Sequence, residues 1–466
     1  MRRASRLKMA SAYLADPEMK SLAAGLPAAE LFPIARLSGS VLMPKSEPER
    51  SSGSWKGDGL LTETVMFDKD KQSTQRGSTK YDLSKALQYE QGSGARQLLS
   101  FLKEHTKHIH NPKFLDWDCT MSGGNMQAIE TIFRMLVTAG DYVIMEEFVF
   151  PETADCLRPM RCKPLPIPID EFGIRVDLLE EVLSSWDFTT RGAKRPTVIY
   201  TVPTGQNPTG VTMNVARRRD LYAMACKYDM IIIEDDPYYF LQMPKYQRNR
   251  ENWISVPKSN KDFLESLVPS MLSFDVEGRV LRLDSCSKVV APGTRCGWIT
   301  GSNQFIERIL RHNEVSLQAP SGLSMAVLHG LLVDCWGQDN YLNWLVNLRA
   351  EYTIRRNAIL DAMEDYLPKD IVSWVPPTAG MFVWMELDYE KHPLKEELSI
   401  EALEYKIYEE SVVNKVLILP GGWFKSSEFS RPRGMYFRAT FASVSQDIMR
   451  LAIQEFAQIV KVSYKK

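Results

Sequence analysis

Residues 230–240, MIIIEDDPYYF, join a short apolar run to a cluster of acidic and aromatic residues. A helix pattern at 215–228 precedes this segment, and another apolar run, 197–202, precedes that helix. Short apolar runs that alternate with helix patterns predict parallel strands joined by crossover helices. The fold class is therefore predicted to be α/β, with a mostly parallel sheet. The same alternation continues through helix patterns at 126–138 and 176–186 and apolar runs at 142–145, 280–283 and 297–301.

The pattern changes beyond about residue 345, where a mixture of helix and strand signals predicts a smaller α+β domain. Its helix patterns lie at 348–366, 400–413 and from Ser445, and its strand-like runs at 374–375, 381–386, 416–419 and 436–440. Three parts are predicted: an N-terminal segment (1–45) that contributes to the small domain and covers the substrate, a large domain (46–345) and a small domain (346–466). The polar stretches 45–82 and 242–278 are predicted to be insertions.

The formal net charge is -1, from 57 basic and 58 acidic residues. This balance offers no global field that would attract nucleic acid or an anionic membrane, so neither partner is expected. No apolar run reaches the ~18–20 residues that span a bilayer.

Cysteine and histidine usage indicates neither a disulfide framework nor a metal site. The seven cysteines are an odd number and include no CxxC pair, which favours reduced thiols in an intracellular protein. The cluster of His105, His108 and His110 is predicted to be a solvated helix end, and no metal is expected.

Polar residues gather just after three of the predicted strands. Acidic and aromatic residues follow 230–233, DSCSK (284–288) follows 280–283, and PTGQNPTG (203–210) follows 197–202. A fourth cluster, SGGN (122–125), opens a helix pattern. Alone, each would be an ordinary turn, cap or surface residue. Because ligands bind beyond the carboxyl ends of strands in such sheets, their joint occurrence indicates one site.

Pyridoxal 5′-phosphate (PLP) accounts for these clusters together. Its aldehyde needs a protein amine, which Lys288 supplies as a Schiff base. Its pyridine nitrogen stays protonated beside a carboxylate such as Asp236. Its phenolate oxygen needs hydrogen-bond donors, here Tyr239 and Asn207. Its phosphate needs a helix N-terminus, hydroxyl groups and a cation. The residues that fit the phosphate are Gly124, Asn125, Ser285, Ser287 and Arg295.

The sequence resembles the class I aminotransferases of PLP fold type I from near its N-terminus to its end. Within that group it is similar to the fungal aromatic-amino-acid and 2-aminoadipate aminotransferases and to the mammalian kynurenine/2-aminoadipate enzyme. The motifs that carry the resemblance are SLAAGLPAAELFP (21–33), LQYEQGSGARQLL (87–99), TVPTGQNPTG (201–210), IIEDDPYYFLQ (232–242), DSCSKVVAPGTRCGWITG (284–301), PTAGMFVW (377–384), LPGGWF (419–424) and YFRATFA (436–442).

The resemblance implies how the chain holds and uses the cofactor. Lys288 would carry the proton between the substrate Cα and the cofactor C4′. Tyr89 would reach the phosphate of the neighbouring subunit, which implies a homodimer. The sequence departs from the family pattern at two positions. Gly124 stands where related enzymes often have serine. Phe150 replaces the tyrosine that stacks on the cofactor ring, although phenylalanine can also stack.

The resemblance also implies how the substrate is bound. Arg438 would bind the substrate α-carboxylate through its planar fork, together with Asn207. Phe382 would line the substrate side chain, and the loop at Gly25 would close over the substrate.

The activity implied is ping-pong transamination of small-molecule amino acid and 2-oxo acid substrates. Aromatic L-amino acids (Phe, Tyr and Trp), and 2-aminoadipate or kynurenine, would give their amino group to 2-oxoglutarate. Another fold type I enzyme, a β-lyase or a decarboxylase, would share the Lys–Asp–Arg core and stays an alternative. Transcription regulators with an aminotransferase-like domain are disfavoured, because the ~20 residues before SLAAGLP are too few for a winged helix. A dinucleotide-dependent dehydrogenase is weaker still, since no GxGxxG follows the first strand.

The N-terminal segment 1–17 is basic and could be a mitochondrial presequence. Because it resembles the entry segment of the family, the enzyme is expected to be cytoplasmic, with a mitochondrial location as the alternative.

Overall fold

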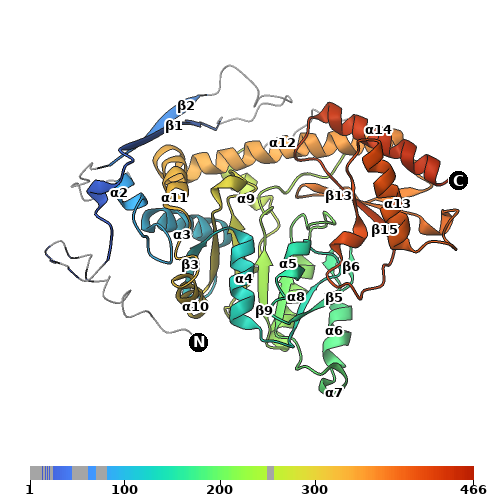
Figure 1. Cartoon of the computed structure of the whole chain (residues 1–466), viewed down its shortest axis with the longest axis horizontal. Coiled ribbons are helices and arrows are strands. Elements are labelled where there is room, and N and C mark those ends of the chain that lie inside the picture. Colours follow the sequence, from blue (N-terminus) through green and yellow to red (C-terminus); the bar gives the residue numbers. More distant parts are fainter. Residues whose placement is uncertain are drawn as a thin grey trace. The chain divides into compact units, whose positions relative to one another are not determined.

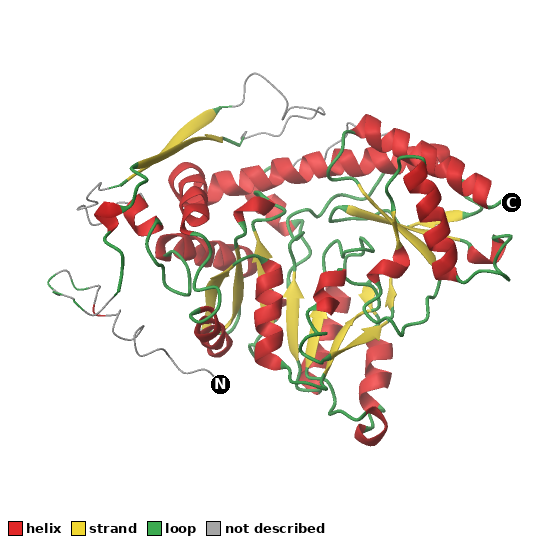
Figure 2. Cartoon of the chain, in the orientation of Figure 1, coloured by secondary structure: helices red, strands yellow, loops and turns green. Residues whose placement is uncertain are grey.

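The computed structural model describes residues 25–44, 61–69, 81–248 and 257–465, together with Tyr13, Asp16, Glu18, Lys20 and Leu22. The helices and strands of these ranges form two compact units (Figures 1 and 2). The first is built from the described parts of 1–46, 57–136 and 270–344. The second is built from the described parts of 137–269 and 345–466.

Three strands of the first unit pair antiparallel in the order β3-β11-β10. Helices α3, α4 and α10 pack against these strands. The register pairs Ser122 at the end of β3, and Ser285 at the end of β10, with Gly297 at the start of β11. The segments that follow β3 and β10 therefore leave the sheet at the same edge. These elements are α3 (Arg96–His110), β3 (Trp117–Ser122), α4 (Asn125–Leu136), β10 (Val280–Ser285), β11 (Gly297–Ser302) and α10 (Asn303–Asn313).

A hairpin of β1 (Arg36–Leu42) and β2 (Thr62–Asp68) is attached to the first unit through one face. Val65 and Phe67 are buried and lie against Gly330, where a Cβ would come within 2.6 Å of the Phe67 ring. The Trp336 indole N–H also donates to the Leu42 carbonyl oxygen, at 2.8 Å. The remaining elements of this unit are η2 (Ala29–Leu31), α2 (Leu83–Ala86), η3 (Met271–Phe274), η4 (Pro292–Thr294), α11 (Gly322–His329) and the π-helix η5 (Gly330–Trp336).

Four strands of the second unit pair in parallel in the order β9-β8-β4-β5. Every residue of β8 is buried, as expected for a parallel strand covered on both faces. The elements of this part are β4 (Tyr142–Glu146), α5 (Pro151–Asp155), β5 (Lys163–Ile167), β6 (Ile169–Asp170), β7 (Gly173–Ile174), α6 (Val176–Ser184), α7 (Phe188–Arg191), β8 (Val198–Thr201), α8 (Val215–Lys227), β9 (Ile231–Asp235) and α9 (Asn260–Glu265).

The C-terminal part of the second unit is a four-stranded antiparallel sheet, in the order β12-β13-β15-β14, covered by α13 and α14. Helix α12 (Gly337–Tyr366) leads into it, and the boundary between the two units falls inside this helix. The other elements are β12 (Val372–Trp374), β13 (Phe382–Leu387), η6 (Tyr389–Lys391), α13 (Ile400–Val413), β14 (Leu419–Pro420), η7 (Gly421–Phe424), β15 (Met435–Thr440) and α14 (Gln446–Ser463).

The pairing of β13 with β15 gives this small sheet two different faces. Successive side chains of a strand point to opposite faces, and the register places Trp384 opposite Arg438. One face carries Val383, Met385, Phe437 and other apolar residues that form a core with α13 and α14. The opposite face carries Phe382, Trp384, Tyr436 and Arg438.

Helix α14 shows how the sheet is covered. It buries Met449, Ile453 and Phe456 toward the core and leaves Ile448 and Leu451 exposed.

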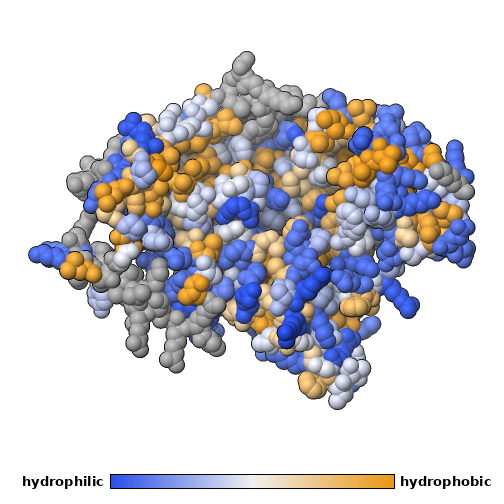
Figure 3. All heavy atoms as spheres, viewed as in Figure 1, coloured by the Kyte–Doolittle hydropathy of each residue, from blue (hydrophilic) through white to orange (hydrophobic). Residues whose placement is uncertain are grey.

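On the face of the protein drawn in Figure 3, hydrophobic and hydrophilic residues are intermixed. No helix of the described ranges is both long and apolar enough to cross a membrane.

The predicted α/β class is confirmed, and most predicted elements are present within a few residues. Three interpretations of the sequence were wrong. Strand β11 is antiparallel to both of its neighbours, not part of a parallel series. Helix α12 begins at Gly337, well before the expected residue 348. His105 and His110 are buried side chains, not part of a solvated helix end.

The two predicted insertions also contain ordered structure. The stretch 45–82 includes β2, while 45–60 and 70–80 lie outside the described residues. The stretch 242–278 includes α9 and the fully buried side chains of Phe263, Met271 and Leu272, while 249–256 lie outside the described residues. All seven cysteines lie within the described ranges, and none of them forms a disulfide. The domain limits stay a prediction.

Replacing Phe437 with alanine is expected to lower the free energy of unfolding by about 3–5 kcal/mol, because it leaves a cavity in the small-sheet core. The Phe437 side chain is fully buried, and its ring centroid lies 5.5 Å from that of Phe456. Urea unfolding followed by circular dichroism would show the lower midpoint. Phe188→Ala is the control, with an expected change of ~0.5 kcal/mol or less, because that residue is 64% exposed. Equal shifts for both variants would show that Phe437 is not a core residue.

Candidate active site

In the first unit, the loop between β3 and α4 leaves room for an arginine side chain. Gly124 has a φ of 93°, which disfavours any side chain, and a Cβ there would lie 2.8 Å from Nη2 of Arg295. Arg295 donates to the carbonyl oxygens of Gly123 (3.3 Å) and Pro292 (3.1 Å). The glycine that departs from the family's usual serine therefore makes space for a cation beside the N-terminus of α4.

The turn that carries Lys288 follows β10 and is fixed through its backbone. The N–H of Cys286 donates to the Cys296 carbonyl oxygen (3.0 Å), and the N–H of Val290 donates to the Cys286 carbonyl oxygen (2.8 Å). The Trp344 indole N–H donates to the carbonyl oxygen of Val289, at 2.6 Å. Lys288 is half-buried in this turn. Its amine is thus carried on a short, well-anchored segment at the end of a strand.

The same edge of the first unit gathers two hydroxyl groups. Ser285 is buried at the end of β10, and its Oγ accepts from the N–H of Ser287, at 3.0 Å. Asn125, at the start of α4, donates from its side chain toward the Leu283 carbonyl oxygen, at 3.5 Å. A helix N-terminus, two serines and an arginine are the groups that a phosphate requires, so these residues fit the phosphate of PLP.

In the second unit, the loops after β8 and β9 leave the parallel sheet at one edge, since the register pairs Thr201 with Glu234. Asp236 and Tyr239 follow β9 and are 2% and 4% exposed, and the Tyr239 N–H donates to the Asp236 carbonyl oxygen at 3.3 Å. Asn207 belongs to the loop after β8 and is also buried. The structure thus brings the predicted ring-binding residues Asn207, Asp236 and Tyr239 to one sheet edge.

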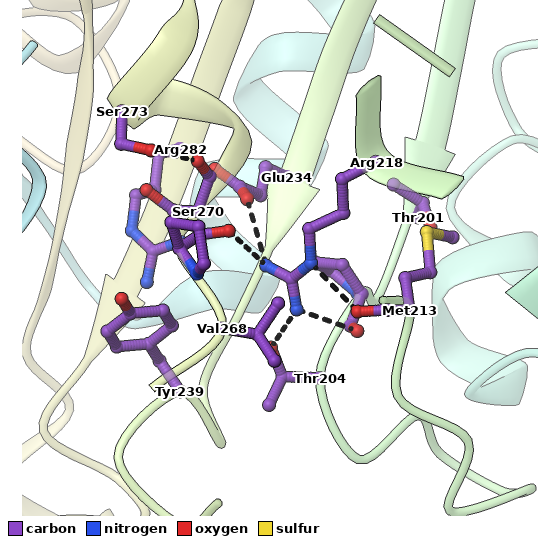
Figure 4. Close-up of polar contacts among 12 residues, drawn as sticks. Thr201, Thr204, Met213, Arg218, Glu234, Tyr239, Val268, Ser270, Ser273 and Arg282 are labelled. Atoms are coloured by element: carbon purple, nitrogen blue, oxygen red, sulfur yellow. Dashed lines mark hydrogen bonds and ion pairs between the residues drawn. The ribbon is translucent and has the colours of Figure 1, made fainter. Parts of the chain in front are cut away.

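The loop after β8 is held by Arg218 of α8, whose side chain is completely buried (Figure 4). Its guanidinium donates to the carbonyl oxygens of Pro203 (3.0 Å) and Met213 (3.1 Å) and to Oγ1 of Thr204 (2.9 Å). It also lies 3.8 Å from Oε1 of Glu234, near the end of β9. One buried cation therefore ties together the segments that carry Asn207 and Asp236.

Arg438, on β15, faces Asn207. Its Nη1 donates to Oδ1 of Asn207 at 2.7 Å, and its guanidinium carbon lies 4.4 Å from the centroid of the Phe382 ring. Burial lowers the pKa of Arg438 from its ordinary value. Among the residues that the structure describes, Arg438 forms no ion pair with a carboxylate. A cation in these surroundings is well suited to receive an anionic ligand.

The remaining predicted residues lie in different surroundings. Phe150 is half-buried at the N-terminus of α5, followed directly by Pro151. Tyr89 is 65% exposed. Gly25 is exposed in a loop. This loop contacts the segment just before Tyr89, because the Gln88 side chain donates to the Pro27 carbonyl oxygen at 2.9 Å. Phe382 was predicted to line the substrate side chain, and the structure places its ring against Arg438.

Sequence reasoning missed two buried carboxyl groups in the second unit. Glu146, at the end of β4, accepts hydrogen bonds from the Thr201 hydroxyl and from the Val202 N–H (3.3 Å). Glu404, on α13, accepts from two backbone N–H groups. Burial raises the pKa of each to about 7. The acid that directly follows the apolar run 142–145 was a visible signal for Glu146, whereas Glu404 has no comparable signal in its helix.

Most of the chain matches known proteins. Residues 75–456 match the family model described as aminotransferase class I and II. The chain belongs to this family. It is 42% identical to an aromatic amino acid aminotransferase of Schizosaccharomyces pombe, covering 96% of this chain and 92% of the relative. It is 34% identical to the mitochondrial kynurenine/alpha-aminoadipate aminotransferase of Bos taurus, covering 82% of this chain and 84% of the relative.

Among solved structures, the chain is similar to aminotransferase Aro8 of Candida albicans, with a TM-score of 0.91 and 36% identity. The match covers 100% of this chain and 96% of that structure. The aminotransferase prediction is therefore confirmed. The protein is a PLP-dependent aminotransferase.

Replacing Glu146 with glutamine is expected to remove a pH dependence of stability. The pKa of this carboxyl is raised from 4.5 to about 7 by burial. The folded state therefore gains stability when the group is protonated at low pH, and it loses that stability as the pH rises through 7. From pH 5 to 8, the wild-type free energy of unfolding should fall relative to that of Glu146→Gln by roughly 2–3 kcal/mol. Urea unfolding at several pH values measures this difference, and a constant difference would contradict the assignment.

Proposed function

We propose that this aminotransferase moves the amino group of aromatic L-amino acids (Phe, Tyr and Trp), and of 2-aminoadipate or kynurenine, to 2-oxoglutarate. The support comes from the relatives named for aromatic amino acids and for kynurenine and alpha-aminoadipate. Both halves of the reaction use one site in turn, because each amino acid leaves as an oxo acid before the acceptor binds.

The observation that carries this proposal is the placement of Arg438 beside Asn207 and the Phe382 ring. Every proposed donor and acceptor has an α-carboxylate, which pairs with a guanidinium fork through two charge-assisted hydrogen bonds. An aromatic ring next to that fork offers apolar contact to a substrate side chain. One receptor can therefore serve both the amino acid and the oxo acid.

The cofactor, when bound, supplies a carbonyl carbon that accepts the amino group and a ring that withdraws electrons from the substrate Cα. Lys288 would hold the cofactor and then move the proton from the substrate Cα. The buried carboxylate of Asp236 would keep the pyridine nitrogen protonated. Tyr239 and Asn207 would hold the phenolate oxygen, and Phe150 would contact the ring. The residues that would hold the phosphate are Gly124, Asn125, Ser285, Ser287 and Arg295.

The wider organisation of the enzyme belongs to the same proposal. Two chains form a homodimer in which Tyr89 contacts the partner's cofactor phosphate, a role that suits its exposed side chain. The large domain (46–345) binds the cofactor, and the small domain (346–466) carries Arg438. The N-terminal segment (1–45) covers the substrate through the loop at Gly25. The enzyme acts in the cytoplasm.

A substrate panel on the purified enzyme tests the proposed reaction. With 2-oxoglutarate as acceptor, Phe, Tyr or Trp should each give the matching oxo acid and one glutamate per turnover. Lys288→Ala should lose essentially all turnover, since removing a catalytic base costs at least ~10²–10⁴-fold. Pyruvate with ammonia, or carbon dioxide, in place of an exchanged oxo acid would instead indicate a β-lyase or a decarboxylase.

Replacing Arg438 with lysine is expected to weaken substrate binding while retaining the positive charge. Lysine cannot form the two-pronged contact, so KM should rise about 10- to 100-fold for both the amino acid and the oxo acid. Steady-state kinetics with Phe and with 2-oxoglutarate measure the two values. An unchanged KM for both substrates would show that Arg438 does not bind the α-carboxylate.

A further inference from the structure

The guanidinium of Arg438 packs against two aromatic rings. Its central carbon lies 4.4 Å from the centroid of Phe382 and 4.5 Å from the centroid of Phe424. Both rings are buried, at 9% and 3% exposure. We refer to Phe382, Arg438 and Phe424 as the carboxylate clamp. With two rings packed against the guanidinium and Nη1 bound to Asn207, its remaining edge is the part left to contact a ligand.

The two rings restrict how the guanidinium can turn. A planar cation packed against two rings is held by attraction to both and by steric contact with both. An unclamped arginine has several rotatable bonds and loses that freedom when it binds a carboxylate. The carboxylate clamp removes part of this cost before substrate arrives. The direction of the fork then depends on where the backbones of β15 and η7 lie.

A single buried carboxylate fixes both of these backbones. Glu404 of α13 is 2% exposed. One of its oxygens accepts from the N–H of Gly422 at 2.7 Å, and the other accepts from the N–H of Tyr436 at 2.7 Å. Gly422 lies two residues before Phe424, and Tyr436 lies two residues before Arg438. Glu404 therefore links the two segments that carry the second ring and the cation of the clamp.

The glycine at 422 belongs to the same arrangement. A Cβ at this position would lie 2.9 Å from Oε2 of Glu404, so a larger residue would displace the carboxylate. The backbone at Phe424 is also fixed by hydrogen bonds to the segment around Val149. Its carbonyl oxygen accepts from the N–H of Val149 at 2.8 Å, and the N–H of Ser426 donates to the Glu147 carbonyl oxygen at 2.9 Å. The Phe424 backbone is thus fixed from two directions.

We propose that Glu404 is a positioning residue for the substrate α-carboxylate, which acts by holding Phe424 and Arg438 in the geometry of the carboxylate clamp. This inference rests on the proposed role of Arg438 and adds to it. Glu404 has no contact with substrate or cofactor in this account. Its effect on the reaction passes through the direction of the Arg438 fork, and it is the same for every substrate that carries an α-carboxylate.

Three possible roles of Glu404 would have different effects on the kinetics: an ordinary core residue, a residue of the side-chain pocket and a positioning residue. A core residue would change stability with no particular effect on KM. A pocket residue would change KM for some substrates and leave others alone. A positioning residue for the clamp raises KM for the amino acid and for the oxo acid by a similar factor, and it leaves kcat near its original value.

The test uses the full-length holoenzyme with Glu404→Gln. Glutamine keeps the size of the side chain but can accept from one of the two N–H groups and not from both. KM for Phe, for a non-aromatic donor such as 2-aminoadipate and for 2-oxoglutarate should each rise about 5- to 20-fold, with kcat within about twofold. Glu409→Gln is the matched control, because Glu409 is exposed on the same helix, and it should match the wild type.

A binding measurement free of turnover accompanies the kinetics. Isothermal titration of the holoenzyme with 3-phenylpropanoate, an unreactive carboxylate, should show weaker binding to Glu404→Gln by the same factor. The neutral amide 3-phenylpropanamide should bind both forms equally. If Glu404→Gln does not fold, Phe424→Leu tests the clamp directly and should give the same uniform rise in KM.

The outcomes separate the failure of this inference from failure of the proposed function. Changes in kcat alone, a KM change for one substrate class alone, or equal loss of carboxylate and amide binding would overturn the role of Glu404. If Arg438→Lys also leaves 3-phenylpropanoate binding unchanged, the assignment of Arg438 as the carboxylate receptor fails as well. If Arg438→Lys binds the carboxylate more weakly while Glu404→Gln and Phe424→Leu have no effect, the proposed role of the carboxylate clamp is wrong and the role of Arg438 remains.

Discussion

The antiparallel pairing of β13 with β15 is the constraint on which the position of Arg438 depends. Its register places Trp384 opposite Arg438, so that one face of the sheet carries the core and the other carries the cation. A slip of one residue would exchange the two faces and send Arg438 into the apolar core. The buried contacts of Phe437 with the helices therefore fix the position of Arg438 as well as the fold.

Buried charges in this protein are held mainly by backbone groups. Arg218 donates to backbone carbonyl oxygens, and Glu404 accepts from two N–H groups. A buried ion leaves water at a high cost in free energy unless such partners are present. Arg438 differs from both, because Asn207, which accepts a hydrogen bond from it, is neutral, and Arg438 forms no ion pair among the described residues. In the proposed function, the substrate carboxylate supplies the negative charge.

Much of this arrangement follows from local sequence signals. The helix pattern predicted near 400–413 agrees with the observed bounds of α13, and in the structure Ser399 caps this helix. The direction of β11 was predicted wrongly, because an apolar run such as 297–301 has the same composition in either direction. The burial of His105 and the early start of α12 depend on tertiary packing, which periodicity does not report. Glu404 was missed because its partners are backbone groups far along the chain.

The most direct test of the central claim is to identify the lysine that carries the cofactor. Borohydride reduction of the holoenzyme converts the link between lysine and PLP into a stable amine, and mass spectrometry of a digest locates it. Our account predicts one labelled site per chain, at Lys288, the half-buried residue in the anchored turn after β10. A label on another lysine, or no label on a protein that still transaminates, would contradict it.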